Sequence, residues 1–92
     1  MGSFLGGSAP AMARQVADGY TLLSPVILKR LADDQLQMLE FELDKRLRDS
    51  RADQVELEDQ KAIQERNRRI SRIENSLRVL RGTMQLRKRK RV

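Results

Sequence analysis

The amino-acid sequence predicts an all-α protein, in which a short N-terminal helix is followed by one long amphipathic coiled-coil helix. Three observations support this. Residues 33–81 contain neither Gly nor Pro, the two residues least favourable inside a helix. Apolar residues in this stretch recur at steps of three and four, which places them on one side of a helix. Alternation at every second residue, the pattern of a half-buried strand, is absent.

The first 32 residues are expected to fall into two parts. Residues 1–13 are rich in Gly, Ser and Ala, a composition that favours disorder. Residues 14–32 predict a short helix or docking segment. Ser24 followed by Pro25 is a typical helix start. Ser caps the first turn, and the missing N–H of Pro costs nothing at the first helical position, where an N–H has no partner within the helix.

The chain just before this helix start is apolar. Gly19 and Tyr20 predict a turn. Two interpretations remain for the apolar residues Tyr20, Leu22 and Leu23: they pack inside the chain, or they form a docking peptide for another protein. We favour packing inside the chain.

Residues 33–81 carry an apolar stripe that we expect to form the seam of a coiled coil with a partner. Its members are Leu36, Leu39, Leu43, Leu47, Ile63, Ile70, Ile73, Leu77 and Leu80. The heptad spacing slips by one residue between Leu47 and Ile63. Either one helix runs through the slip, or the chain turns back near Ser50 to make an antiparallel helical hairpin. We favour the continuous helix, because residues 48–53 contain no Gly, Pro or Asn.

Charge is sorted along the same stretch. Residues 33–60 hold ten acidic and four basic residues, whereas residues 61–92 hold two acidic and twelve basic residues. Asp33 is expected to cap the long helix, with Asp34 in its first turn. Because the two halves carry opposite charge, helices of this sequence should pair antiparallel, acidic half against basic half.

Residues 82–92 are predicted to form a basic tail. Gly82 lies where a helix C-cap is expected, and the block from Arg87 to Arg91 follows it. Such blocks serve as nuclear import signals or bind phosphate backbones. The residues expected to bind an import receptor or nucleic acid are Arg66, Arg68, Arg69, Arg87, Lys88, Arg89, Lys90 and Arg91.

One short motif adds to the nucleic-acid alternative. Glu65-Arg66-Asn67-Arg68-Arg69 is similar to the Glu-Arg-x-Arg-Arg core of basic helix-loop-helix DNA-binding proteins. The resemblance implies that these side chains contact base edges and phosphates. It covers five residues, because no loop and second helix follow Leu80 as that family requires.

Composition excludes several classes of function. The 92 residues contain no Cys and no His, so thiolate chemistry and the commonest general base are both missing. We therefore expect no catalytic, cofactor or metal-binding residues, and a run of apolar residues long enough to span a membrane is also missing. The sequence predicts a soluble, intracellular, non-enzymatic interaction module or subunit of a complex. Its partner would be a second copy or another helical protein, and its basic tail would direct it to the nucleus. The alternative is a nucleic-acid-binding protein that presents residues 66–91 to phosphates.

Overall fold

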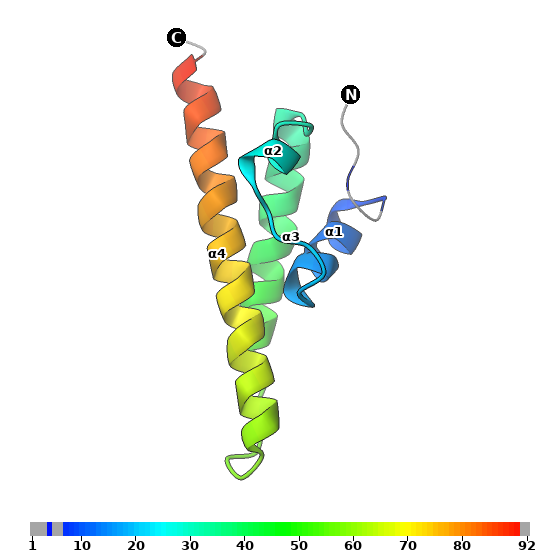
Figure 1. Cartoon of the computed structure of the whole chain (residues 1–92), viewed down its shortest axis with the longest axis vertical. Coiled ribbons are helices and arrows are strands. Elements are labelled where there is room, and N and C mark those ends of the chain that lie inside the picture. The colour runs from blue at the N-terminus through cyan, green and yellow to red at the C-terminus, as the bar shows by residue number, and fades with distance from the viewer. Residues whose placement is uncertain (1–3, 5–6, 91–92) are drawn as a thin grey trace.

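The protein folds as a helical hairpin with two short helices packed along one side. The computed structural model describes residue 4 and residues 7–90, and in this part of the chain it contains four helices and no strand. They are α1 (Ala9–Ala17), α2 (Pro25–Leu28), α3 (Asp33–Ala52) and α4 (Gln60–Lys90). Figure 1 shows α3 and α4 side by side and antiparallel, with α1 and α2 beside them. The all-α prediction is confirmed.

The continuous helix over residues 33–81 needs correction, because the hairpin alternative is the one observed. α3 ends at Ala52, and Asp53 adopts an extended conformation with φ −66° and ψ 116°. Seven residues, 53–59, then reverse the chain, and the Asp59 carboxylate accepts a hydrogen bond from the Ala62 N–H at 3.0 Å at the start of α4. None of the seven has a positive φ, so the turn needs no Gly or Asn.

The positions of the apolar stripes explain why the chain turns. Leu43 and Ile73 lie thirty residues apart. On one straight helix with 3.6 residues per turn their side chains would point about 120° apart, so no single partner helix could cover both stripes. The turn allows each stripe to face the other, and both Leu43 and Ile73 are fully buried.

The core runs along the contact between α3 and α4, and α1 closes it on one side. Three buried alanines of α1, Ala9, Ala13 and Ala17, repeat every four residues, so their small side chains allow this helix to lie close to α3 and α4. Ser8 caps α1 by accepting a hydrogen bond from the Ala11 N–H at 3.2 Å. The prediction of disorder over residues 1–13 therefore needs correction from Ser8 onwards, since burial of this alanine face orders the segment. Residues 1–3 and 5–6 lie outside the described residues.

The connection from α1 to α2 follows the predicted turn. Gly19 has φ +86°, a conformation that other residues rarely adopt. Ser24 accepts a hydrogen bond from the Ile27 N–H at 3.3 Å and Pro25 starts α2, as expected. Of the three apolar residues in this connection, only Leu23 is buried, whereas Tyr20 and Leu22 are exposed.

Both ends of the hairpin differ from the predicted boundaries. α3 starts at Asp33, and the preceding Ala32 is its N-cap, with the Ala32 N–H donating to Gln35 Oε1 at 2.8 Å. α4 continues through Gly82 to Lys90, so Gly82 is not a C-cap and the basic block is helical as far as the structure describes it. Contacts of Met84 with the core and of Arg87 with α2 hold these last turns in place.

Candidate functional site

The residues predicted to form a partner seam lie inside the chain's own core. Seven of them are buried: Leu36, Leu39, Leu43, Leu47, Ile73, Leu77 and Leu80. Ile63 and Ile70 are half-buried, and Ile70 packs against the same core. The sequence predicted that another molecule would cover this stripe. Because α3 and α4 cover each other, the stripe does not require one.

The sorted charges pair antiparallel within one chain. Arg81 on α4 lies 2.8 Å from Glu40 Oε2 and 3.8 Å from Asp44 Oδ1 on α3. Arg51 near the end of α3 lies 2.6 Å from Glu74 Oε2 on α4. Arg81 with its two partners therefore follows the sorted charge, with acidic α3 residues beside a basic α4 residue, whereas Arg51 with Glu74 has the reverse order. Antiparallel pairing between helices of different chains stays a prediction.

Arg66, predicted to contact phosphates, instead holds the turn end of the hairpin. Its Nη2 donates to the Arg51 carbonyl at 2.8 Å, and its Nε donates to the Asp53 carbonyl at 3.0 Å. The last carbonyls of a helix have no partner within that helix. Arg66 supplies one for the C-terminal end of α3, so its guanidinium is already engaged.

Arg87, the first residue of the basic block, has the same role at the open end. Its guanidinium donates to the carbonyls of Leu28 at 3.0 Å and Leu31 at 2.7 Å, and to Asp33 Oδ1 at 3.0 Å. Its side chain is only 27% exposed. Arg87 therefore fastens the end of α2 and the start of α3 to α4, and it is not part of a solvated tail.

The other predicted contact residues remain available. Arg68, Lys88, Arg89 and Lys90 are exposed, and within the described residues they make no ion pair or hydrogen bond. Arg69 is half-buried beside α1. Arg91 lies outside the described residues.

A second regular stripe runs along the side of α4 that faces solvent, and we call it the outer stripe. It repeats at steps of four and three and consists of Gln64, Arg68, Ser71, Asn75, Arg78, Gly82, Gln85 and Arg89. All eight residues are exposed, and none is acidic or large and apolar. It spans about 38 Å at 1.5 Å per residue. Its polar residues recur at the same helical spacing in the sequence, but apolar spacing alone does not reveal them.

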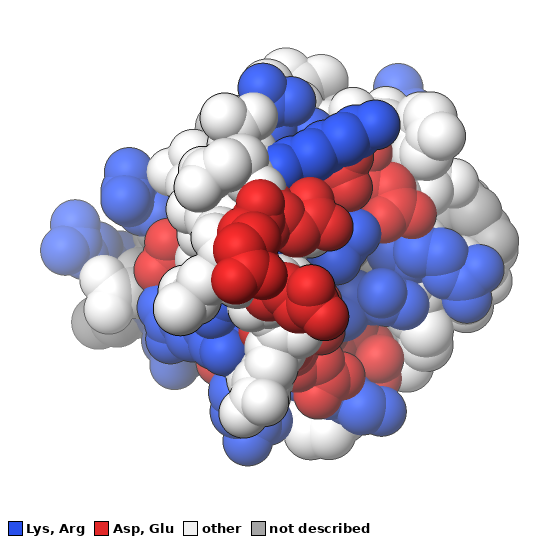
Figure 2. Space-filling view, turned by 90° about the horizontal axis from the view of Figure 1, so that it is seen from below, with Lys and Arg blue, Asp and Glu red and all other residues white. Residues whose placement is uncertain are grey.

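The turn has the opposite charge. Its acidic residues Asp53, Glu56, Glu58 and Asp59 are all exposed, and no basic residue lies between them. Figure 2, which looks at the molecule from below, shows acidic side chains gathered on this end, with basic side chains around them. A long anion bound to the outer stripe would thus be repelled by the acidic turn. The turn therefore limits how far such an anion can extend beyond the start of α4.

The described residues offer no metal site and no membrane-spanning helix. Among the described residues, no group of three Asp, Glu, His or Cys side chains could hold a metal ion. None of the helices described is both long and apolar enough to cross a membrane. Comparison of the chain with protein-family models, curated proteins and solved structures found no match. The chemistry of the surface is therefore the only guide to function.

Proposed function

We propose that this chain is a non-enzymatic binding protein that holds the phosphate backbone of a nucleic acid on the outer stripe of α4. The observation that carries the proposal is the composition of this stripe. Arg occupies every third position of the stripe, with two neutral residues (Ser and Asn, then Gly and Gln) between successive arginines; every position is exposed, and acidic residues are missing over its full length.

These residue types suit phosphate binding for physical reasons. Arg presents a planar fork of N–H donors that matches phosphate oxygens, whereas Gln, Asn and Ser add neutral hydrogen bonds to backbone or base edges. Two exposed lysines, Lys88 and Lys90, lie close to Arg89 at the end of the helix. α4 contains no aromatic residue on which unpaired bases could stack, which favours a duplex over a single strand.

The strength of binding can be bounded. If Arg68, Arg78, Arg89 and the two neighbouring lysines each neutralise one phosphate, about five counterions are released. The logarithm of the affinity should then fall against the logarithm of salt concentration with a slope of about −4 to −5. Such binding is largely independent of sequence and weakens steeply between low and physiological salt.

The test is fluorescence anisotropy with a labelled duplex at several salt concentrations. Changing Arg68→Gln, Arg78→Gln and Arg89→Gln together should weaken binding at least tenfold and reduce the slope by about three. A matched control carries Lys29→Gln, Arg30→Gln and Lys45→Gln, which removes the same charge from exposed sites off the stripe. Equal loss in both variants would show that net charge alone binds, and the proposal would be wrong.

A protein partner is the second candidate function, and a different surface supports it. Tyr20, Leu22 and Val26 are 83%, 79% and 70% exposed. All three lie in one seven-residue span, which runs from the end of the turn after α1 into α2. Apolar side chains this exposed and this close together are typical of a contact surface. The predicted homo-oligomer or helical protein partner would then bind here and not at the apolar seam.

Sedimentation at micromolar concentration tests the case of two copies. The wild-type chain should be larger than a monomer, and Tyr20→Ser with Leu22→Ser should make it monomeric without loss of helicity. A wild-type chain that sediments as a monomer would rule out self-association through this surface.

We also propose that the last turn of α4 acts as a nuclear import signal. The proposed signal is shorter than the basic block predicted from the sequence. Lys88, Arg89 and Lys90 are exposed there, whereas Arg87 is engaged within the chain. Changing these three exposed residues to Gln should abolish nuclear accumulation and leave the fold intact. Retention of nuclear accumulation in this variant would contradict the proposal.

A further inference from the structure

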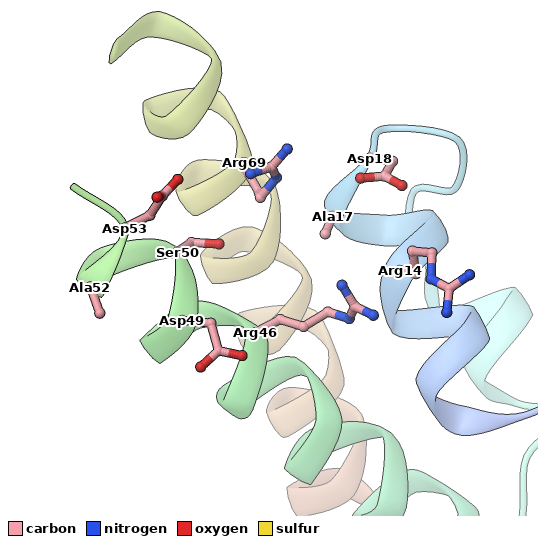
Figure 3. A pocket seen from close by; sticks show the side chains of 9 residues that line it. All are labelled: Arg14, Ala17, Asp18, Arg46, Asp49, Ser50, Ala52, Asp53 and Arg69. Atoms are coloured by element: carbon pink, nitrogen blue, oxygen red, sulfur yellow. The ribbon is translucent and has the colours of Figure 1, made fainter. Parts of the chain in front are cut away.

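A groove of about 550 Å³ lies between the C-terminal end of α1 and the two helices of the hairpin. Three arginines line it, and each comes from a different helix: Arg14 from α1, Arg46 from α3 and Arg69 from α4. Figure 3 shows Arg46 reaching from α3 toward α1, where Arg14 lies on the facing side. This groove is separate from the outer stripe.

Of the three guanidinium groups in this groove, that of Arg46 has a shielded donor without an acceptor, whereas Arg14 is exposed and Arg69 is half-buried. Arg46 is also half-buried, and the shielded donor is its Nε. Within the described residues, neither Arg14 nor Arg69 makes an ion pair or a hydrogen bond. The arginines at the ends of the hairpin behave differently, since Arg66 and Arg87 each bond several acceptors. Buried donors normally have a partner, so an unpartnered one requires an explanation.

Acidic residues of the same groove do not supply the acceptor. Asp18, Asp49 and Asp53 also line it, yet none of them forms an ion pair with the three arginines. In Figure 3 the Asp49 carboxylate points away from the guanidinium of Arg46. Ser50, whose residue surface is only 7% exposed, adds a hydroxyl group to the groove.

We propose that this groove binds a phosphoryl group as its dianion. Two or three guanidinium groups can each donate parallel N–H bonds to different phosphate oxygens, the geometry in which arginine binds phosphate most strongly. The Nε of Arg46 then gains an acceptor, and the like charges of Arg14 and Arg46 are neutralised. Because the three arginines belong to three helices, the bound group also holds α1 against the hairpin.

Thermal unfolding and isothermal titration test this site, with sodium chloride at matched ionic strength as the reference. Inorganic phosphate should raise the melting temperature of the wild-type chain and bind with one-to-one stoichiometry. Arg46→Gln should weaken binding at least tenfold, and Arg46→Lys, which keeps the charge but loses the fork, should weaken it almost as much. Arg48→Gln is the control, because Arg48 lies on the same helix but is exposed and outside the groove.

Two further ligands identify the source of the phosphoryl group. If a nucleoside monophosphate binds more tightly than inorganic phosphate, the ligand is a free nucleotide. If a duplex with a 5′-phosphate binds at least fivefold more tightly than the same duplex with a 5′-hydroxyl, the ligand is a nucleic-acid end. Either result supports the site when Arg46→Gln abolishes the preference.

The proposal is overturned if phosphate stabilises the wild-type chain no more than chloride does, or if it stabilises Arg46→Gln equally. These outcomes are independent of the function proposed for the outer stripe. The variant with Arg68, Arg78 and Arg89 changed to Gln retains all three groove arginines, so it should still bind phosphate with wild-type affinity.

Discussion

The inner and outer sides of α4 use the same residue type for opposite tasks. On the inner side, Arg66 and Arg87 bond carbonyls at the two ends of the hairpin. On the outer side, Arg68 and Arg89 are exposed, and within the described residues they have no partner. The members of each pair lie two positions apart, a step that rotates a side chain by about 200° around the helix.

A run of basic residues is therefore not one functional unit. The sequence places Arg66 in the same short motif as Arg68, and Arg87 in the same block as Arg89. The fold divides each pair, because Arg66 meets carbonyls at the C-terminal end of α3, and Arg87 meets carbonyls at the end of α2 and in the connection that follows it. Substitutions on the two sides of α4 should therefore differ in their effect on stability.

The largest effect should come from the apolar inner side. Leu77 is 2% exposed, so Leu77→Asp places a carboxylate in the core, and the free energy of unfolding should fall by several kcal/mol. A chain of this size has only about 5–10 kcal/mol of stability, so most helicity should be lost in circular dichroism. Leu86→Asp, at a residue that is 52% exposed, should retain it. Equal losses would show that the two sides of α4 do not differ.

Arg87 and Arg89 provide the direct comparison between the two sides. Arg87→Gln removes charged hydrogen bonds to three carbonyls and to Asp33, so urea unfolding should show a loss of about 1–3 kcal/mol. Arg89→Gln removes the same charge from an exposed position and should change stability by less than about 0.5 kcal/mol. A similar loss in both variants would remove the structural role assigned to Arg87.

Gly82 tests the outer side with a change that should increase stability. It lies within α4, and a Cβ built there meets no atom within 4 Å. Gly82→Ala should therefore raise the free energy of unfolding by about 0.5–1 kcal/mol, because Ala loses less entropy in a helix. Thermal and urea unfolding measure this. Lower stability would indicate that the outer side makes contacts within the chain that the structure does not show.

The smallest effect should come from the exposed ion pairs at the border of the two sides. Arg81 is 52% exposed and its partner Glu40 is 31% exposed. A double-mutant cycle with Arg81→Gln and Glu40→Gln should give a coupling of about 0.2–1 kcal/mol that decreases at high salt. A coupling above 2 kcal/mol would mean that this pair, and not the arginine at each end, holds the hairpin together.

Much of the fold was predictable from local patterns. Apolar residues at helical spacing identified the core residues of α3 and α4, and Ser24 with Pro25 identified the start of α2. Sorting of charge predicted that acidic and basic halves lie antiparallel, and within the chain Arg81 pairs with Glu40 in this way. The candidate site was predicted only in part. Arg68 and Arg89 belong to the outer stripe, whereas Gln64, Ser71 and Asn75 were missed.

The sequence by itself determined that the chain is helical, where its apolar stripes lie and that its charge is divided along its length, because these properties depend on residues close together in the chain. Only the tertiary structure decided that α3 and α4 cover each other, and that Arg66 and Arg87 are used within the chain. Those outcomes depend on which direction a stripe faces after the turn at residues 53–59, and on which carbonyls come within reach of side chains that are between 13 and 59 residues away in the sequence.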